Sequence, residues 1–238
     1  LLVVSLPLTC QPIPMTQEFA ALYVVPTPLG HRGDMSQRAI EVLRRVSWVA
    51  AEDTRHSAPL LRQYGCNARL LPAHQHNEED AAQRVIARLA VGESVALVVD
   101  AGTPGVSDPG ARLVARVRAA GHRVVPLPGP CAAIVALSAA GLGEAHFLFY
   151  GFLPTKAGQR AEALSQLAHL PYALIFYEAP HRIVESIAAL ATGFALIAEG
   201  VWLRLKYKDK ELLADIAVRE RLQAELELFR TAVEHSPI

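Results

Sequence analysis

The sequence predicts an α/β protein with a mainly parallel sheet. Short apolar runs rich in Val, Leu and Ala alternate with segments whose apolar residues recur at helical spacing, from Ala21 to about Leu190. This alternation is typical of parallel strands joined by crossover helices. The run Val95–Val99 is apolar at every position, as expected for a strand covered on both faces.

The first part of the chain is expected to hold five strands with a helix after each. Asp34 and Gln37 resemble a capping box at the start of the first helix, and Asp108 and Pro109 predict the N-cap and first position of a later one. Most helices end at a glycine. The expected order is strand 22–25, helix 36–46, strand 47–51, helix 54–64, strand 69–73, helix 78–91, strand 94–99, helix 110–120, strand 123–127 and helix 130–140.

The pattern pauses at 141–144 and then resumes with strand 147–150, helix 156–168, strand 172–177 and helix 180–190. We therefore expect two α/β units, covering 21–142 and 143–192. Residues 1–20 are expected to be an extension without a role in the fold, with Met15 as a natural start. Residues 193–238 are expected to form a divergent, charged helical tail.

Composition excludes some classes of protein. Lys plus Arg and Asp plus Glu are both 23, and this balance argues mildly against a nucleic-acid binder without excluding a local basic patch. The three cysteines are far apart, which predicts neither a disulfide framework nor a zinc site and fits the reducing cytoplasm. Residues 1–9 are too short and lack the basic start of a signal peptide, so no membrane association is expected. His74 and His76 lack a third ligand nearby, and no metal is expected.

Ligands of open α/β sheets bind beyond the carboxyl ends of the strands, so the turns there form the candidate site. One turn rich in Gly, Pro and Thr is an ordinary tight turn. Several at corresponding strand ends favour a rigid backbone site for a neutral or cationic cofactor. Neither a P-loop nor a GxGxxG fingerprint occurs, and no lysine is placed to hold a phosphate. The turns are 26–30, 52–55, 100–110, 128–132, 151–154 and 177–182.

These turns, in this order and at this spacing, resemble the motif set of the ribosomal RNA small subunit methyltransferase I family, which belongs to the tetrapyrrole methylases. The resemblance implies a tetrapyrrole-methylase-like fold of two α/β units with a cofactor cleft between them. It also implies a homodimer that binds S-adenosyl-L-methionine and methylates the ribose 2′-oxygen of a cytidine in small-subunit ribosomal RNA. The segments that carry it are Leu22–Gly30, Ala51–Arg55, Asp100–Gly110, Pro128–Ala132, Gly151–Pro154 and Tyr177–Arg182.

The resemblance also assigns candidate site residues. Those expected to bind the cofactor are Thr27, Pro28, Gly30, Asp100, Gly102, Thr103, Pro104, Gly105, Pro128, Gly129, Pro130, Cys131 and Ala132. Candidate catalytic groups that ease deprotonation of the hydroxyl are Glu178, Asp53 and His181. Arg55 and Arg182 are candidates for binding RNA phosphates. Glu52 and Asp53 could form a catalytic pair, and an equally weighted alternative is that Asp53 caps a helix and pairs with Arg55. For Asp100, support of the glycine-rich loop is favoured over a role as base.

Two departures from the family pattern bear on function. Cys131 replaces a usual serine, which exchanges a hydroxyl for a weaker hydrogen-bonding thiol. After Leu190 the family continues with a strand and an Arg-Glu-Leu-Thr-Lys motif, and neither is visible here. The tail has either diverged or is read in another frame. The alternatives are therefore a tetrapyrrole C-methyltransferase of the same fold and an inactive remnant that binds the cofactor.

Overall fold

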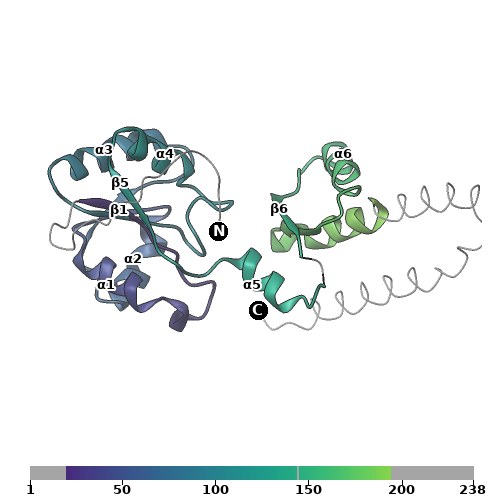
Figure 1. The fold of residues 1–238 in the computed structure, drawn as a ribbon, viewed down its shortest axis with the longest axis horizontal. Helices are drawn as coiled ribbons and strands as arrows, with labels where there is room; N and C mark the ends of the chain where they lie inside the picture. Colours follow the sequence, from purple (N-terminus) through teal and green to yellow (C-terminus); the bar gives the residue numbers. More distant parts are fainter. Residues whose placement is uncertain (1–19, 144, 194–238) are drawn as a thin grey trace, which may run out of the picture. The chain divides into compact units, whose positions relative to one another are not determined.

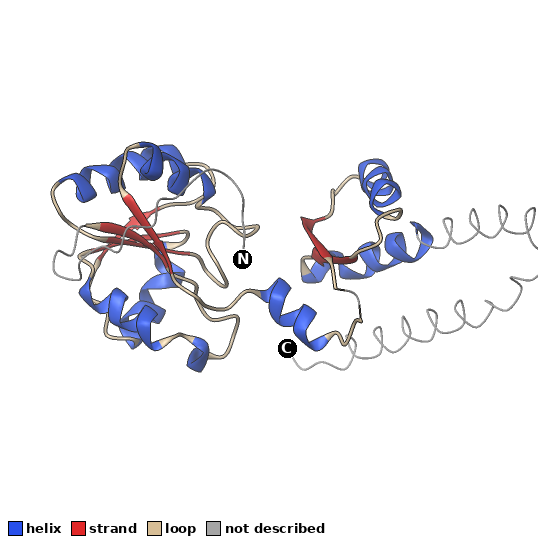
Figure 2. Ribbon diagram, viewed as in Figure 1, coloured by secondary structure: helices blue, strands red, loops and turns tan. Residues whose placement is uncertain are grey.

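The computed structural model describes residues 20–143 and 145–193 of the 238-residue chain. The chain divides into two compact units, Leu1–Gly143 and Glu144–Ile238, and each is considered by itself. The extension up to residue 19 and the tail from residue 194 onwards lie outside the described residues. In both units strands alternate with helices along the chain (Figure 2), so the predicted α/β class with parallel sheets is confirmed.

The first unit is built on a five-stranded sheet with the order β3-β2-β4-β1-β5. All neighbouring strands are parallel. The carboxyl ends of all five strands therefore lie at one edge of the sheet, and β4 is at its centre. The strands are β1 (Ala21–Val24), β2 (Trp48–Ala51), β3 (Arg69–Pro72), β4 (Val95–Val98) and β5 (Arg123–Pro126).

Two helical layers cover the sheet (Figure 1). Helices α1 (Gln37–Arg45) and α2 (Thr54–Gln63) lie on one face, and α3 (Glu78–Ala90) and α4 (Ala111–Ala119) lie on the other. Successive strand residues point to opposite faces. In β4, Ala96 and Val98 pack with the α1 and α2 side, whereas Val95 and Leu97 pack with α3 and α4. This double coverage explains why every position of the central strand is apolar.

The start of α1 differs from the prediction. Its N-cap is Ser36, whose hydroxyl accepts a hydrogen bond from the backbone N–H of Ala39 at 3.2 Å. Asp34 instead ends a short 3-10 helix, η1 (Arg32–Asp34). The predicted capping box of Asp34 and Gln37 is therefore wrong, because the 3-10 turn places the cap two residues later.

The start of α4 also differs. Neither Asp108 nor Pro109 begins the helix, because Gly110 occupies the N-cap position with a φ of 123°. A side chain at Gly110 would place its Cβ 2.9 Å from Leu97 Cδ2, so glycine is required on steric grounds as well. The free amides at this helix start are bound by Glu78, a residue of α3.

The described part of the second unit is smaller. Strands β6 (Phe147–Phe152) and β7 (Ala173–Tyr177) pair in parallel, with a register shift between Phe149 and Gly151. Helix α6 (Ala157–Leu167) connects them, and the 3-10 helix η2 (Pro180–Arg182) leads into helical residues 183–193. Helix α5 (Ala132–Ala139) precedes this unit in the chain. The helix predicted to begin at residue 180 thus opens with a 3-10 turn.

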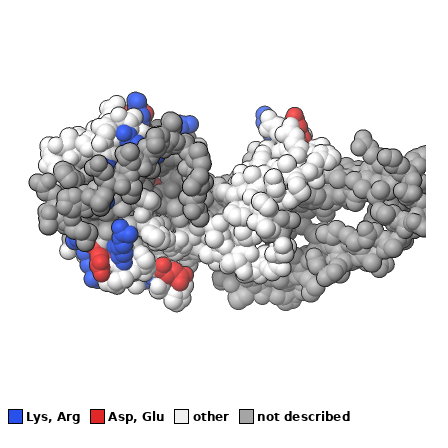
Figure 3. All heavy atoms as spheres, viewed as in Figure 1, with Lys and Arg blue, Asp and Glu red and all other residues white. Residues whose placement is uncertain are grey.

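The described part of the second unit carries few charges on the face shown in Figure 3. Aromatic side chains of β6 remain exposed, with Phe147 at 45% and Phe152 at 50%. Phe149 and Phe152 meet Tyr177 of β7 edge to face, at 4.8 Å and 5.7 Å between ring centres. Among residues 20–143 and 145–193, no helix has the length and apolarity needed to cross a membrane.

Candidate functional site

Four of the predicted turns start at the same edge of the first unit's sheet, after β1, β2, β4 and β5. Three of them follow β1, β4 and β5, which are neighbours in the sheet and run in the same direction. We call them the β1 loop (26–30), the β4 loop (100–110) and the β5 loop (128–132). After β1 the chain crosses to α1 on one face of the sheet, and after β4 it crosses to α4 on the other face. Open α/β sheets bind ligands where the connections of two adjacent strands go to opposite faces in this way.

Thr27 joins the β1 loop to the β4 loop. Its backbone N–H donates to the Gly102 carbonyl at 2.8 Å, and its carbonyl accepts from the Gly102 N–H at 3.0 Å. Its hydroxyl, 1% exposed, donates to the Val99 carbonyl at 2.9 Å. All three polar groups of Thr27 are thus engaged with the end of β4. Thr27, a predicted site residue, therefore holds the two loops together through these contacts.

Thr103 joins the β4 loop to the β5 loop, because its hydroxyl donates to the Pro130 carbonyl at 2.7 Å. Gly129 lies so close to Pro26 that an added Cβ would be 2.7 Å from the Pro26 Cβ. Cys131 occupies the N-cap of α5 but makes no side-chain capping hydrogen bond there. The three loops therefore form one assembly through backbone and hydroxyl contacts.

The cofactor-binding residues predicted from the sequence differ in how far they are exposed to solvent. Pro28, Gly102 and Pro104 are buried beneath it. Thr103, Pro130, Cys131 and Ala132 are half-buried. Gly30, Gly105, Pro128 and Gly129 are exposed.

The β4 loop has an unusual backbone. Gly102, Gly105 and Gly110 have φ angles of 93°, 80° and 123°, and Ser107 has a φ of 60°. Ser107 is the one non-glycine residue with positive φ in the part of the chain that the structure describes. Such a conformation costs on the order of 1–3 kcal/mol and persists where surrounding contacts enforce it. Here Gly105 N–H donates to the Pro109 carbonyl at 3.1 Å within the loop.

Three carboxylates gather around this loop. Glu52 follows β2, and its Oε2 accepts from the Asp100 backbone N–H at 3.4 Å. Burial, together with the charges of Glu52 and Asp100, raises the pKa of Asp108 to about 6. Burial, and the charges of Asp100 and Asp53, likewise raise the pKa of Glu52. Within the described residues, Asp100 Oδ1 is buried without a hydrogen-bond partner.

This group of carboxylates gives the site a negative potential. Ionised carboxyl groups placed together and away from water are each less stable than in solution, so a bound cation would relieve them. The described residues hold no group of three or more His, Cys, Asp or Glu side chains arranged to hold a metal ion. His74 and His76 lie with ring centres 6.1 Å apart. The three carboxylates therefore favour a bound cation.

Asp53 and Arg55 make the contacts that are expected if Asp53 caps a helix and pairs with Arg55. Asp53 caps α2, with its Oδ1 accepting from the Arg55 backbone N–H at 2.8 Å, and its Oδ2 lies 3.1 Å from an Arg55 guanidinium nitrogen. The side-chain hydrogen bond from Arg55 lowers the pKa of Asp53, which makes this carboxylate a weaker proton acceptor. Arg55 itself is 91% exposed, so its remaining donors are accessible.

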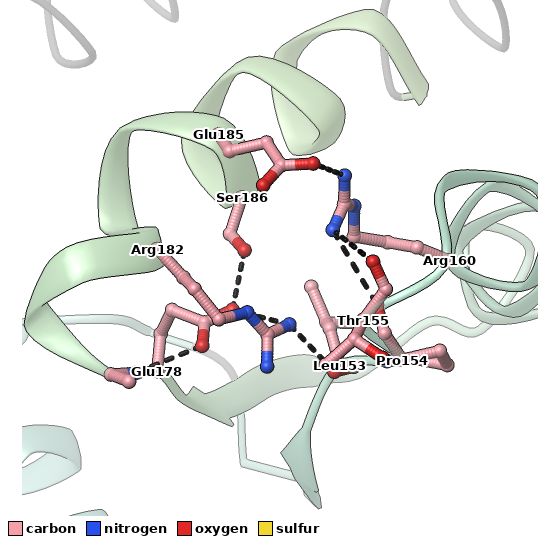
Figure 4. Close-up of polar contacts among 9 residues, drawn as sticks. Leu153, Pro154, Thr155, Arg160, Glu178, Arg182, Glu185 and Ser186 are labelled. Carbon is pink, nitrogen blue, oxygen red and sulfur yellow. Dashed lines mark hydrogen bonds and ion pairs between the residues drawn. The ribbon is translucent and has the colours of Figure 1, made fainter.

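Glu178 and Arg182 form a mostly buried ion pair in the second unit (Figure 4), with Glu178 Oε2 3.3 Å from an Arg182 guanidinium nitrogen. The Glu178 side chain is 6% exposed and that of Arg182 is 17% exposed. Glu178 also accepts from its neighbour, the Ala179 N–H, at 2.8 Å and from the Ser186 hydroxyl. Burial alone would raise the pKa of Glu178, but these hydrogen bonds and the Arg182 charge together lower it.

The same region binds the loop that follows β6. Arg182 donates to the Leu153 carbonyl at 3.0 Å, and Arg160 donates to the Thr155 carbonyl at 3.4 Å (Figure 4). Arg160 has a side chain that is 4% exposed and pairs with Glu185. These contacts hold the 153–155 loop against α6 and η2. Of the three predicted catalytic residues, His181 alone is exposed, on η2.

Sequence reasoning assigned no site role to Asp108 or Glu78, and it considered Glu52 only as the partner of Asp53 in a candidate catalytic pair. Glu52 directly follows a predicted buried strand at the ligand-binding edge. Asp108 was interpreted as a helix cap, which its position before Pro109 favours. Glu78 gave no signal, because an acidic residue in the first turn of a helix is ordinarily explained by the helix dipole.

Comparison with known proteins agrees with this geometry. The family model described as Tetrapyrrole (Corrin/Porphyrin) Methylases matches residues 21–202. A protein of Escherichia coli O157:H7 named ribosomal RNA small subunit methyltransferase I is 54% identical over 166 residues, which cover 70% of this chain and 58% of that protein. Its namesake in Xylella fastidiosa (strain Temecula1) is 51% identical over 194 residues, covering 82% of this chain and 71% of that protein.

Solved structures show the same fold at low identity. The methyltransferase CobJ matches with a TM-score of 0.54 and 22% identity, over 73% of this chain and 76% of that chain. Uroporphyrin-III-C-methyltransferase from Thermus thermophilus matches with a TM-score of 0.51 and 22% identity, over 74% and 73% of the two chains. The family model and the sequence relatives show that the chain belongs to the tetrapyrrole methylases and, within them, to the ribosomal RNA small subunit methyltransferase I family.

Proposed function

We propose that this chain is an S-adenosyl-L-methionine-dependent methyltransferase that methylates the ribose 2′-oxygen of a cytidine in small-subunit ribosomal RNA. Family membership supports the reaction class and the RNA substrate, since the relatives carry the name of a small-subunit ribosomal RNA methyltransferase. The assembled β1, β4 and β5 loops support a cofactor seat in the first unit. A homodimer and a cytoplasmic location belong to the same proposal.

The observation that carries the proposal is the partnerless carboxylate oxygen of Asp100, together with the neighbouring Glu52 and Asp108. S-adenosylmethionine carries a sulfonium and an ammonium cation and no phosphate. No lysine occurs between residues 20 and 143, so the first unit lacks the phosphate-binding lysine of a P-loop. The residues present therefore fit this cofactor by charge.

The cofactor, when bound, supplies a methyl group made electrophilic by its cationic sulfur. The protein then has to hold the ribose 2′-oxygen in line with that group, and positioning of this kind can lower the barrier substantially. The contacts of Thr27 and Thr103 keep the loops rigid, so the geometry does not have to form anew at each turnover.

The proton of the 2′-hydroxyl also needs an acceptor. With a pKa of about 6, Asp108 lies in the range suited to accepting a proton near neutral pH. The pKa values of Asp53 and Glu178 are lowered, so these carboxylates are weaker acceptors. We place Asp108 first among the candidates and keep exposed His181 as the second. Arg55, which is 91% exposed, is the proposed ligand for RNA phosphates.

Transfer of a tritiated methyl group tests the proposal. Purified small subunits from cells that lack this modification are incubated with the protein and labelled cofactor, and the RNA is then hydrolysed with alkali. A 2′-O-methyl group blocks cleavage at the neighbouring phosphodiester, so label in an alkali-resistant dinucleotide supports the proposal.

Large subunits and a corrinoid precursor serve as the two control substrates. Transfer to the precursor and none to small subunits would show the C-methyltransferase alternative. Binding of the cofactor without any transfer would show the inactive remnant.

A further inference from the structure

We propose that Glu78 is a positioning residue of the cofactor site formed by the three loops. Glu78 holds the β4 loop in its binding conformation at the end opposite to Thr27. This inference rests on the proposed function, because it gives a role to a residue that supports the same site. Glu78 lies in the first turn of α3 and contacts the end of the β4 loop at the start of α4.

The geometry is specific to one oxygen atom. Glu78 Oε2 accepts from the backbone N–H groups of Gly110 at 3.1 Å, Arg112 at 3.1 Å and Leu113 at 3.3 Å. Glu78 is 8% exposed, so these bonds form largely away from water. The first amides of a helix have no partner within the helix, and a carboxylate there is favoured by both hydrogen bonding and the helix dipole.

The β4 loop needs such support because its backbone does not favour this conformation by itself. Ser107 has a positive φ, and three glycines of the loop do as well. One end of the loop is held by the paired Thr27 and Gly102 backbones. The other end has no side-chain cap of its own, since Gly110 occupies the N-cap position of α4. Glu78 supplies the missing contact from α3.

The Glu78 carboxylate binds Gly110, and Asp108 lies two residues before Gly110 in the β4 loop. Gly105 N–H binds the Pro109 carbonyl at 3.1 Å, so the segment from Gly105 to Gly110 is a closed turn. Loss of the Glu78 contact would let this turn adopt other conformations. Only the fraction of molecules in the competent conformation binds the ligand, and the apparent Kd rises as that fraction falls.

The adjacent Glu79 provides a matched control. It belongs to the same helical turn and has the same charge, but it is 52% exposed and pairs with Arg116, which is 58% exposed. Neutralising Glu79 changes the net charge of the protein and the start of α3 as neutralising Glu78 does. It leaves the amides of the β4 loop untouched.

The test compares the wild type with Glu78→Ala, Glu78→Gln and Glu79→Gln in the full chain. Isothermal calorimetry with S-adenosylmethionine is run well below each variant's unfolding temperature, so that all molecules are folded. We expect Glu78→Ala to raise the Kd about tenfold, which corresponds to about 1.4 kcal/mol. Glu78→Gln keeps an acceptor oxygen without the charge and should show a smaller increase, whereas Glu79→Gln should match the wild type.

Hydrogen exchange without ligand gives a second readout that is independent of the proposed function. Both Glu78 variants should exchange faster at 102–113, and Glu79→Gln should not. Should Glu78→Ala fail to fold, Glu78→Gln carries both measurements. An unchanged Kd in a folded Glu78 variant, or unchanged exchange at 102–113, overturns the inference.

A wild type that binds no S-adenosylmethionine overturns the proposed function. The claim that Glu78 positions a cofactor site would then fail together with the proposed function. Faster exchange in the Glu78 variants alone would then reveal only a structural anchor, so the two failures are distinguishable.

Discussion

Replacing Asp108 by asparagine should stabilise the protein at neutral pH. Asp108 is half-buried beside Glu52 and Asp100, and its pKa is raised to about 6 from the ordinary 3.8. Between these two values the folded protein binds more protons than the unfolded chain. The free energy of unfolding therefore falls as pH rises through this window, and at neutral pH the wild type bears the whole cost. Asparagine has a similar shape and no charge.

The size of this effect follows from the shift. A change in pKa of about 2 units, at about 1.36 kcal/mol each, gives an upper bound of about 3 kcal/mol. Asp108 is only half-buried, and solvent screens a large part of that energy. We therefore expect Asp108→Asn to raise the free energy of unfolding by about 1 kcal/mol at pH 7.5.

Urea unfolding of both proteins at pH 7.5, 6 and 4 measures the difference directly. The difference in free energy of unfolding between the two proteins should shrink as the pH falls from about 6 to about 4, because Asp108 in the folded protein then becomes neutral like the asparagine. A variant that is no more stable at pH 7.5, or a gain that persists unchanged at pH 4, would refute the reasoning. Asp53→Asn is the control of opposite sign. The pKa of Asp53 is lowered by its hydrogen bond from Arg55, so this variant should lose stability at neutral pH.

Three further substitutions test the site. Thr27→Val removes the buried hydroxyl bound to the Val99 carbonyl and should lower the free energy of unfolding by about 1–3 kcal/mol; a thermal melt identical to that of the wild type would contradict this role. Gly129→Ala sets a methyl group against the Pro26 ring and should weaken S-adenosylmethionine binding in calorimetry, whereas unchanged affinity would show that the β5 loop does not touch the cofactor. Arg55→Ala should weaken binding of small-subunit RNA in a filter assay more than cofactor binding, and an equal loss of both would rule out a phosphate contact.

The architecture of the first unit was largely predictable. The strands are short and mainly apolar, and the fully apolar β4 predicts a strand covered on both faces, as the structure shows. The position of the candidate site followed from the same logic, because parallel strands place their following turns at one edge. Thr27 and Gly102 were singled out in this way and do lie together.

The contacts that could not be predicted link residues distant in sequence. The start of α4 is capped by Glu78, which precedes it by more than thirty residues, so the local pattern at Asp108 and Pro109 suggested the wrong cap. The raised pKa of Asp108 has the same origin, since Glu52 reaches it only through the order of strands in the sheet. Local patterns identify turns, but they do not show which carboxylates meet.

The ion pair between Glu178 and Arg182 illustrates a second limit of prediction from sequence. Both were predicted to act on the substrate, one as a base and the other on RNA phosphates. Their spacing of four residues also suits an internal ion pair, and the structure shows that pair with both side chains mostly buried. Residue type and motif alone do not distinguish these roles, because the distinction depends on burial.

Hydrogen exchange with and without S-adenosylmethionine tests most directly whether the three loops of the first unit hold the cofactor. The amides that slow on binding should fall in the β1 loop, the β4 loop and the β5 loop, with the helical layer of α1 and α2 unaffected. Protection confined to other segments, or none at saturating cofactor, would contradict the account.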